Sequence, residues 1–150
     1  MEKIERELIL NVDRKTLWDF VSTPVNLNDI TPPDLDFRIV SDLPETIHNG
    51  LIIVYEISLP IIGRRKWVTE IKHVREGISF VDEQRSGPYG FWYHLHELAD
   101  AGEGRSSMRD QVHYQVPFGL FGRSFAGGMV RSRLEDIFDY RSARMKEIFR

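Results

Sequence analysis

The chain has 150 residues, of which 41% are hydrophobic and 29% are charged, and its formal net charge is −3. This length is sufficient for one domain with its own hydrophobic core. The absence of cysteine excludes a disulfide scaffold, a thiolate zinc site and a cysteine nucleophile. The small net charge gives no general attraction to nucleic acid or anionic lipid, so we expect no nucleic-acid partner.

The sequence predicts a soluble cytoplasmic protein without integral membrane association. Its first ten residues, MEKIERELIL, carry charges throughout and lack the apolar run and cleavage site of a signal peptide. The most apolar stretch, LIIVYEISLPII at 51–62, is interrupted by Glu56 and Pro60 and is too short to span a bilayer.

The N-terminal part predicts a strand followed by two short helices. Residues 3–12 show the alternation of a strand. Asp13 is a good N-cap for a helix over 14–22, in which apolar residues recur at helical spacing. Pro24 is expected to end this helix, and 25–31 is typical of a second short helix, because two prolines follow it.

The middle of the chain predicts about six strands joined by turns. A short strand is expected over 36–41. Five longer segments of alternating or β-branched character follow at 50–59, 64–74, 78–84, 91–98 and 107–116. The connections are short and contain glycine, which is typical of antiparallel hairpins.

One long amphipathic helix is expected from about Phe121 onward. Its apolar residues recur every three or four positions over about 25 residues. It is the only predicted element able to cover the apolar face of the sheet. Gly127 and Gly128 leave two interpretations open: the helix begins after them, or small residues are needed where it crosses a cavity or bends.

Alternation along each strand predicts which side chains point inward. The apolar set of the last strand includes one acid, Asp110, which is therefore expected to point inward as well. Two segments, 80–85 and 91–98, are left undecided by alternation alone. The inward residues predicted for the other strands are Met108, Asp110, Val112, Tyr114 and Val116; Trp67, Thr69 and Ile71; and Leu51, Ile53, Tyr55, Ile57 and Leu59.

Two motif runs lie in the predicted strands and the turns beside them: FVDEQRSGPYGFWYHLHEL at 80–98 and MRDQVHYQVPFGLFG at 108–122. These runs resemble the SRPBCC superfamily, also called START-like or Bet v 1-like. The similarity is greatest to its bacterial ligand-binding, polyketide cyclase/dehydrase-like branch, whose members share D-x-Q-x-x-G-P, W-x-H-x-H and D-x-V-x-Y-x-x-P-x-G. The matching positions are Asp82, Gln84, Gly87, Pro88, Trp92, His94, His96, Asp110, Val112, Tyr114, Pro117 and Gly119.

The resemblance implies one START-like domain over residues 1–150 with an α+β helix-grip fold. In that fold a curved antiparallel sheet wraps around a long C-terminal helix, two short helices follow the first strand, and a cavity lies between sheet and helix. The expected volume is about 300–1,000 Å³ if the cavity is a ligand site. The residues expected to bind a ligand there are Tyr55, Trp67, Asp82, Gln84, Trp92, Tyr114, Phe125 and Met129.

The resemblance also places Trp92, His94 and His96 inward with Asp82, Gln84 and Asp110. Because the strands of Gln84, His94 and Asp110 are consecutive, these three side chains could be cross-strand neighbours. Three roles are open for the two histidines. As metal ligands they would need a more complete shell, so we expect neither a metal nor another cofactor. As an acid–base pair with Asp110 they would be the candidate catalytic residues, because a buried carboxylate raises the pKa of an imidazole and orients its ring. As a self-satisfied hydrogen-bonded network they would simply line a wall, which is the interpretation we favour.

The predicted function is therefore binding of a hydrophobic small molecule, lipid-like or polyketide-like, between the sheet and the C-terminal helix. The alternative is a cyclase- or dehydratase-type enzyme that uses the histidine–aspartate pair in the same cavity. A third possibility is a protein-interaction module whose cavity is vestigial, and a homodimer is left open.

Overall fold

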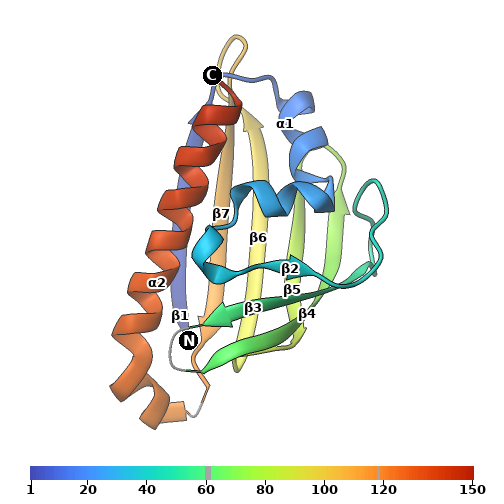
Figure 1. Cartoon of the computed structure of the whole chain (residues 1–150). Helices are drawn as coiled ribbons and strands as arrows, with labels where there is room; N and C mark the ends of the chain where they lie inside the picture. The colour runs from blue at the N-terminus through green and yellow to red at the C-terminus, as the bar shows by residue number, and fades with distance from the viewer. Residues whose placement is uncertain (60–61, 118) are drawn as a thin grey trace.

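The fold is a curved antiparallel sheet with one long helix and several short helices on its concave face (Figure 1). The computed structural model describes residues 1–59, 62–117 and 119–150, with side chains in these ranges except at 119–123 and 125. The predicted α+β helix-grip fold is confirmed. The described helices are α1 (Arg14–Val21), the 3₁₀ helices η1 (Pro24–Ile30) and η2 (Pro33–Leu35), and α2 (Gly119–Ile148).

The described residues form one sheet of seven strands, in the order β1-β7-β6-β5-β4-β3-β2, and each neighbouring pair is antiparallel. Strands β3 to β7 follow one another through short turns, as predicted. Strand β1 pairs with β7 and thereby joins the start of the chain to its last hairpin. The strands are β1 (Glu2–Leu10), β2 (Arg38–Ile39), β3 (Ile52–Leu59), β4 (Gly63–Arg75), β5 (Ser79–Ser86), β6 (Phe91–Asp100) and β7 (Ser106–Gln115).

The short helices follow the predicted boundaries closely. Asp13 caps α1, since its carboxylate accepts hydrogen bonds from the backbone N–H of Thr16 at 2.9 Å and from the Thr16 hydroxyl at 2.7 Å. Pro24 begins η1, where its missing N–H costs no hydrogen bond. The strand expected over 36–41 is reduced to the two residues of β2.

The inward sets predicted from alternation are confirmed, and the two undecided strands are resolved. In β6 the buried side chains are Trp92, His94, His96 and Leu98, which agrees with the resemblance. The buried apolar residues of the concave face form two clusters. One contains Trp18, Phe80 and Met145 under α1, and the other contains Trp67, Trp92 and Phe138 under the middle of α2.

Helix α2 has 30 residues and begins at Gly119, earlier than predicted. Figure 1 shows it running in front of β1 and β7, with η1 beside it over the middle of the sheet. Leu134, Phe138 and Met145 form its buried stripe. No helix in the described ranges is both long and apolar enough to cross a membrane.

Gly127 and Gly128 lie inside α2, so the interpretation that the helix begins after them is wrong. A Cβ atom added at either position would meet nothing within 4 Å of it in the described structure. Close packing therefore does not require glycine at these two positions. In the described structure, no contact offsets the helix stability that glycine loses relative to alanine.

We predict that Gly127→Ala and Gly128→Ala each raise the free energy of unfolding by about 0.5–1 kcal/mol, because alanine loses less backbone entropy in a helix. Urea denaturation of each variant measures the change. Destabilisation by either substitution would contradict this prediction and would mean that the helix bends or is closely approached at that point.

Candidate functional site

Two histidines and two aspartates meet on the concave face at the centre of β5, β6 and β7. In the register of these strands, Asp82 on β5 lies opposite His94 on β6, and Asp110 on β7 lies opposite His96. Residues two apart on a strand point to the same face, so His94 and His96 both point inward. We refer to Asp82, His94, His96 and Asp110 as the His/Asp quartet.

Each imidazole of the quartet lies between the two carboxylates. His94 Nε2 is 2.8 Å from Asp110 Oδ1 and His94 Nδ1 is 3.3 Å from Asp82 Oδ2. His96 Nε2 is 2.9 Å from Asp82 Oδ2 and His96 Nδ1 is 2.8 Å from Asp110 Oδ1. This last contact lacks hydrogen-bond geometry, so His96 Nδ1 has an ionic neighbour without a hydrogen bond. The quartet is thus a nearly closed ring of alternating acids and bases.

Aromatic neighbours hold the quartet in place. The ring of Phe80 stacks on His96 at 4.3 Å between centroids, and the two imidazoles lie 3.7 Å apart. Phe138 of α2 meets His94 edge to face at 5.6 Å. The indole N–H of Trp92 donates to Asp82 Oδ1 at 3.1 Å. Rings locked in this way have few alternative rotamers.

The quartet is buried, and its members set each other's ionisation. The exposed fraction of the side chain is 4% for His94, 7% for His96, 9% for Asp110 and 21% for Asp82. Burial raises the pKa of both carboxyls, but the charge of His94 and hydrogen bonds from both histidines hold each pKa well below its ordinary range. Burial lowers the pKa of His94, yet the charge of Asp82 and the bonds to both acids raise it overall.

The quartet also contains the one group in the described residues that is arranged to hold a metal ion. Asp82, His94 and His96 can each offer a ligand atom, and these atoms lie within 4.8 Å of one another. The same atoms already face hydrogen-bond or ionic partners within the quartet, so protons are sufficient to satisfy them. That no metal is needed stays a prediction, which elemental analysis of gently purified protein would test.

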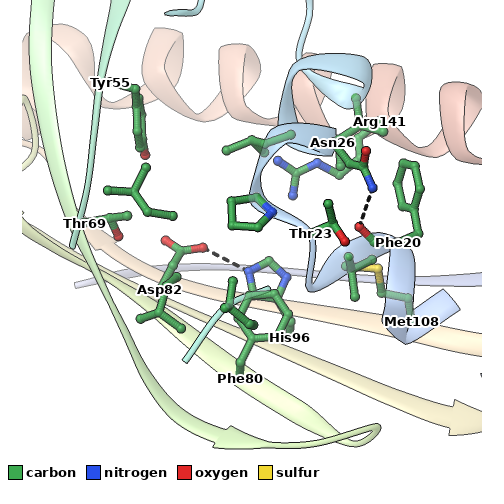
Figure 2. A pocket seen from close by; sticks show the side chains of 17 residues that line it. Phe20, Thr23, Asn26, Tyr55, Thr69, Phe80, Asp82, His96, Met108 and Arg141 are labelled. Atoms are coloured by element: carbon green, nitrogen blue, oxygen red, sulfur yellow. Dashed lines mark hydrogen bonds and ion pairs between the residues drawn. The ribbon is translucent and has the colours of Figure 1, made fainter. Parts of the chain in front are cut away.

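Two pockets lie between the concave face and the helices, one on each side of Leu27, Tyr55 and Arg141, which line both. The Phe20 pocket, shown in Figure 2, has Asp82 and His96 on its sheet side, and Arg141 reaches in from α2. The Trp67 pocket is lined by aromatic and aliphatic side chains and by His94. Each has a volume of about 100 Å³, so the predicted 300–1,000 Å³ is too large.

Several of the predicted ligand-binding residues do face these pockets. Tyr55 lines both, Asp82 lines the Phe20 pocket, and Trp67 and Trp92 line the Trp67 pocket. Of the three candidate catalytic residues, His96 faces the first pocket and His94 the second, whereas Asp110 lines neither.

Three predicted positions differ from expectation, and the structure does not test a fourth. Tyr114 is buried in the second apolar cluster and does not line either pocket. Gln84 is not a cross-strand neighbour of His94: its side-chain amide donates to the backbone carbonyl of Tyr89 and accepts from the N–H of Tyr89, which fixes the turn after β5. Met129 is 46% exposed on α2 and lines neither pocket. The side chain of Phe125 lies outside the described residues.

The most informative pocket residue that the sequence analysis missed is Arg141. It follows Phe138 by three positions and precedes Met145 by four, so it occupies a place in the apolar stripe of α2. A charged residue in an apolar stripe is a signal that periodicity could have detected. Leu27 was missed because η1 is a 3₁₀ helix, in which apolar spacing does not indicate the buried face as clearly.

Comparison with known proteins supports the fold. No known family profile matches the chain, and no curated protein matches it. A START superfamily protein from Mycobacterium smegmatis is 10% identical, with a TM-score of 0.66 over 97% of this chain and 98% of that chain. A ginseng major latex-like protein from Panax ginseng is 12% identical, with a TM-score of 0.71 over 99% of this chain and 97% of the other.

A third similar structure is a nucleoside-diphosphate sugar epimerase from Corynebacterium glutamicum, at 21% identity and a TM-score of 0.69. The match covers 96% of this chain but spans only 28% of the epimerase chain. At these identities the comparisons establish an SRPBCC/START-like fold, in agreement with the sequence motifs.

We predict that the free energy of unfolding passes through a maximum as the pH changes. The lowered pKa values of Asp82 and Asp110 give stability that is present above about pH 4 and is lost as these acids become protonated on acidification. The raised pKa of His94 gives stability that is present below about pH 6.5 and is lost as pH rises through the folded pKa.

Urea denaturation between pH 3 and pH 9 measures this profile for the wild type, for His94→Gln and for a control, His113→Gln. His113 lies on the outer face of β7 and takes no part in the quartet. The alkaline decline should weaken in His94→Gln and persist in His113→Gln. Wild-type stability that keeps rising from pH 6.5 to pH 9 would contradict the prediction.

Proposed function

We propose, from the START-like fold and the two pockets inside it, that this protein binds a small hydrophobic molecule between the sheet and α2. The observation that carries the proposal is the pair of adjoining pockets under η1 and α2, where the sheet and these helices would otherwise pack directly together. Their walls are mainly apolar and aromatic with a few polar groups, which is the usual character of a small-molecule site.

The size of the pockets supports a small ligand or an extended chain. A 150 Å³ apolar cavity is known to accept benzene, so a pocket of about 100 Å³ suits a short alkyl chain or part of one ring. Of the described residues, Leu27, Tyr55 and Arg141 are the ones that line both pockets. A longer ligand would fill both if these side chains changed rotamer.

We predict that straight-chain primary amides from hexanamide to decanamide bind the full-length protein. Affinity should rise about fourfold for each added CH₂ group until the pocket is full, because each buried CH₂ contributes about 0.8 kcal/mol. Leu27→Trp should abolish this binding, because the indole would fill the boundary of both pockets. Isothermal titration calorimetry measures the affinities.

Val25→Trp is the matched control, since Val25 lies on the same helix but is 54% exposed. Urea denaturation would first confirm that both variants fold, because overpacking at Leu27 has its own cost. Absence of amide binding to the wild type, or equal binding by wild type and Leu27→Trp, would refute the proposal. Native mass spectrometry of protein purified from its own host is an independent measurement, which detects a natural ligand that co-purifies with the protein.

Acid–base catalysis of the cyclase or dehydratase type is a second candidate. The specific observation in its favour is that Asp82 and His96, paired at 2.9 Å, line the Phe20 pocket. A ligand with an enolisable carbonyl could meet a positioned base there. Against this role, both imidazoles are already occupied by carboxylates, which favours a network that holds the strands together.

Asp110→Asn distinguishes the two roles. If the quartet is structural, as we expect, the substitution lowers the free energy of unfolding by about 1–3 kcal/mol, since a buried partner is left unsatisfied. Asp100→Asn, at a 72% exposed side chain, should change it little. Unchanged stability of Asp110→Asn, together with a 10²–10⁴-fold loss of turnover in a measurable reaction, would establish catalysis instead.

A further inference from the structure

Arg141 is a cation placed in an apolar environment. It lies in the buried stripe of α2 between Phe138 and Met145 and lines both pockets. Its guanidinium carbon is 5.4 Å from the centre of the Phe138 ring. Figure 2 shows the side chain entering the Phe20 pocket from the helix side, opposite Asp82 and His96.

Within the described structure, Arg141 has no ion pair and no hydrogen bond, and its Nε atom is buried without a partner. A guanidinium keeps its charge in proteins, so the cost of removing it from water is not avoided by deprotonation. An anion that paired with it would offset that cost. The other described arginines of α2 all have carboxylate partners: Arg131 with Glu135, Arg133 with Asp34 and Arg144 with Glu147.

The charged residues that line the two pockets favour an anionic ligand group in only one of them. The Phe20 pocket contains Asp82, whose carboxylate would repel an anionic ligand. The described residues that line the Trp67 pocket include no acid, and they include His94 together with Arg141. Electrostatic complementarity therefore favours a negative group in the Trp67 pocket.

A second residue with an unpartnered hydrogen-bond donor lines the Trp67 pocket. The indole Nε1 of Trp67 is buried and, among the described residues, has no hydrogen-bond partner. A carboxylate is an acceptor only, with about four lone-pair sites, so it could accept from both Trp67 and Arg141. The aromatic walls formed by Tyr89 and Trp92 would surround the apolar part of the same ligand.

We propose that the Trp67 pocket binds the carboxylate of an apolar organic acid, with Arg141 as its counter-ion. The proposal rests on the ligand-binding function above and names the chemical class of the ligand. It requires no rearrangement of the quartet, because Arg141 takes no part in that network.

The test compares carboxylates with amides of the same chain length. Hexanoate, octanoate and decanoate are titrated by calorimetry at neutral pH against their primary amides, using the full-length protein. Hydrogen bonds to a charged partner should make each acid bind about 10- to 100-fold more tightly than its amide. Arg141→Met should bring the ratio of acid to amide affinity at each chain length close to one, and Arg141→Lys should retain part of the preference for acids.

Arg131→Gln is the matched control, because it removes one positive charge from an exposed, ion-paired position on the same helix. It should keep the preference for acids. The melting temperature of ligand-free Arg141→Met should be no lower than that of the wild type, since Arg141 has no ion pair or hydrogen bond among the described residues and methionine can also pack against Phe138.

Equal affinity of wild type for acids and amides, or an acid preference that persists in Arg141→Met, would overturn this inference while leaving the ligand-binding function intact. Failure of the wild type to bind either series would refute the ligand-binding function and this inference with it. If Arg141→Met does not fold, Arg141→Gln makes the same comparison.

Discussion

The concave face of the sheet is the constraint on which the rest of the structure depends. A curved sheet of long antiparallel strands presents more apolar surface than one helix can cover, so α2 is joined by α1 and η1 on the same face. The packing is close where large side chains from both layers share one cluster and line neither pocket, as with Trp18 of α1, Leu98 of β6 and Met145 of α2. Where they do not meet, the two pockets remain.

The buried polar side chains on this face fall into two groups, which differ in whether they have partners inside the fold. Within the quartet each carboxylate faces two imidazoles and each imidazole faces two carboxylates, although His96 Nδ1 lies beside Asp110 without a hydrogen bond. Such a network can hold three strands in register at little net cost. Trp67 and Arg141 are different, because their buried donor atoms have no partner among the described residues. Unsatisfied groups inside a fold are costly, and a ligand that binds them would provide the missing acceptors.

The sequence predicted the fold and the content of the quartet, because both depend on local rules. Alternation placed Asp110 on the inner face, and the family resemblance of the motif runs placed Asp82, His94 and His96 there. The pairing within the quartet depends on strand register, which a single sequence does not specify. For this reason Gln84 was expected beside His94, although it fixes a turn two residues further along β5.

Pocket size and ligand chemistry were less accessible from the sequence. The volume depends on how side chains from η1, β3 and α2 meet, and these contacts join residues far apart in the chain. Met129 shows the same difficulty, since it was expected to line the cavity but faces outward on α2. Arg141 was missed, although a charged residue in an apolar stripe is a signal that periodicity could have detected. Its lack of an ion pair or hydrogen bond among the described residues is visible only in the structure.

Ligand binding inside the fold is tested most directly by methyl NMR of the protein during titration with octanoate. Binding between the sheet and α2 predicts chemical-shift changes concentrated in the methyl groups of Leu27, Ile137 and Leu134, which line the Trp67 pocket. The exposed methyl groups of Ile9 and Ile52 should remain unchanged. Shifts confined to such exposed groups, with the pocket methyls unaffected, would contradict a ligand site inside the fold.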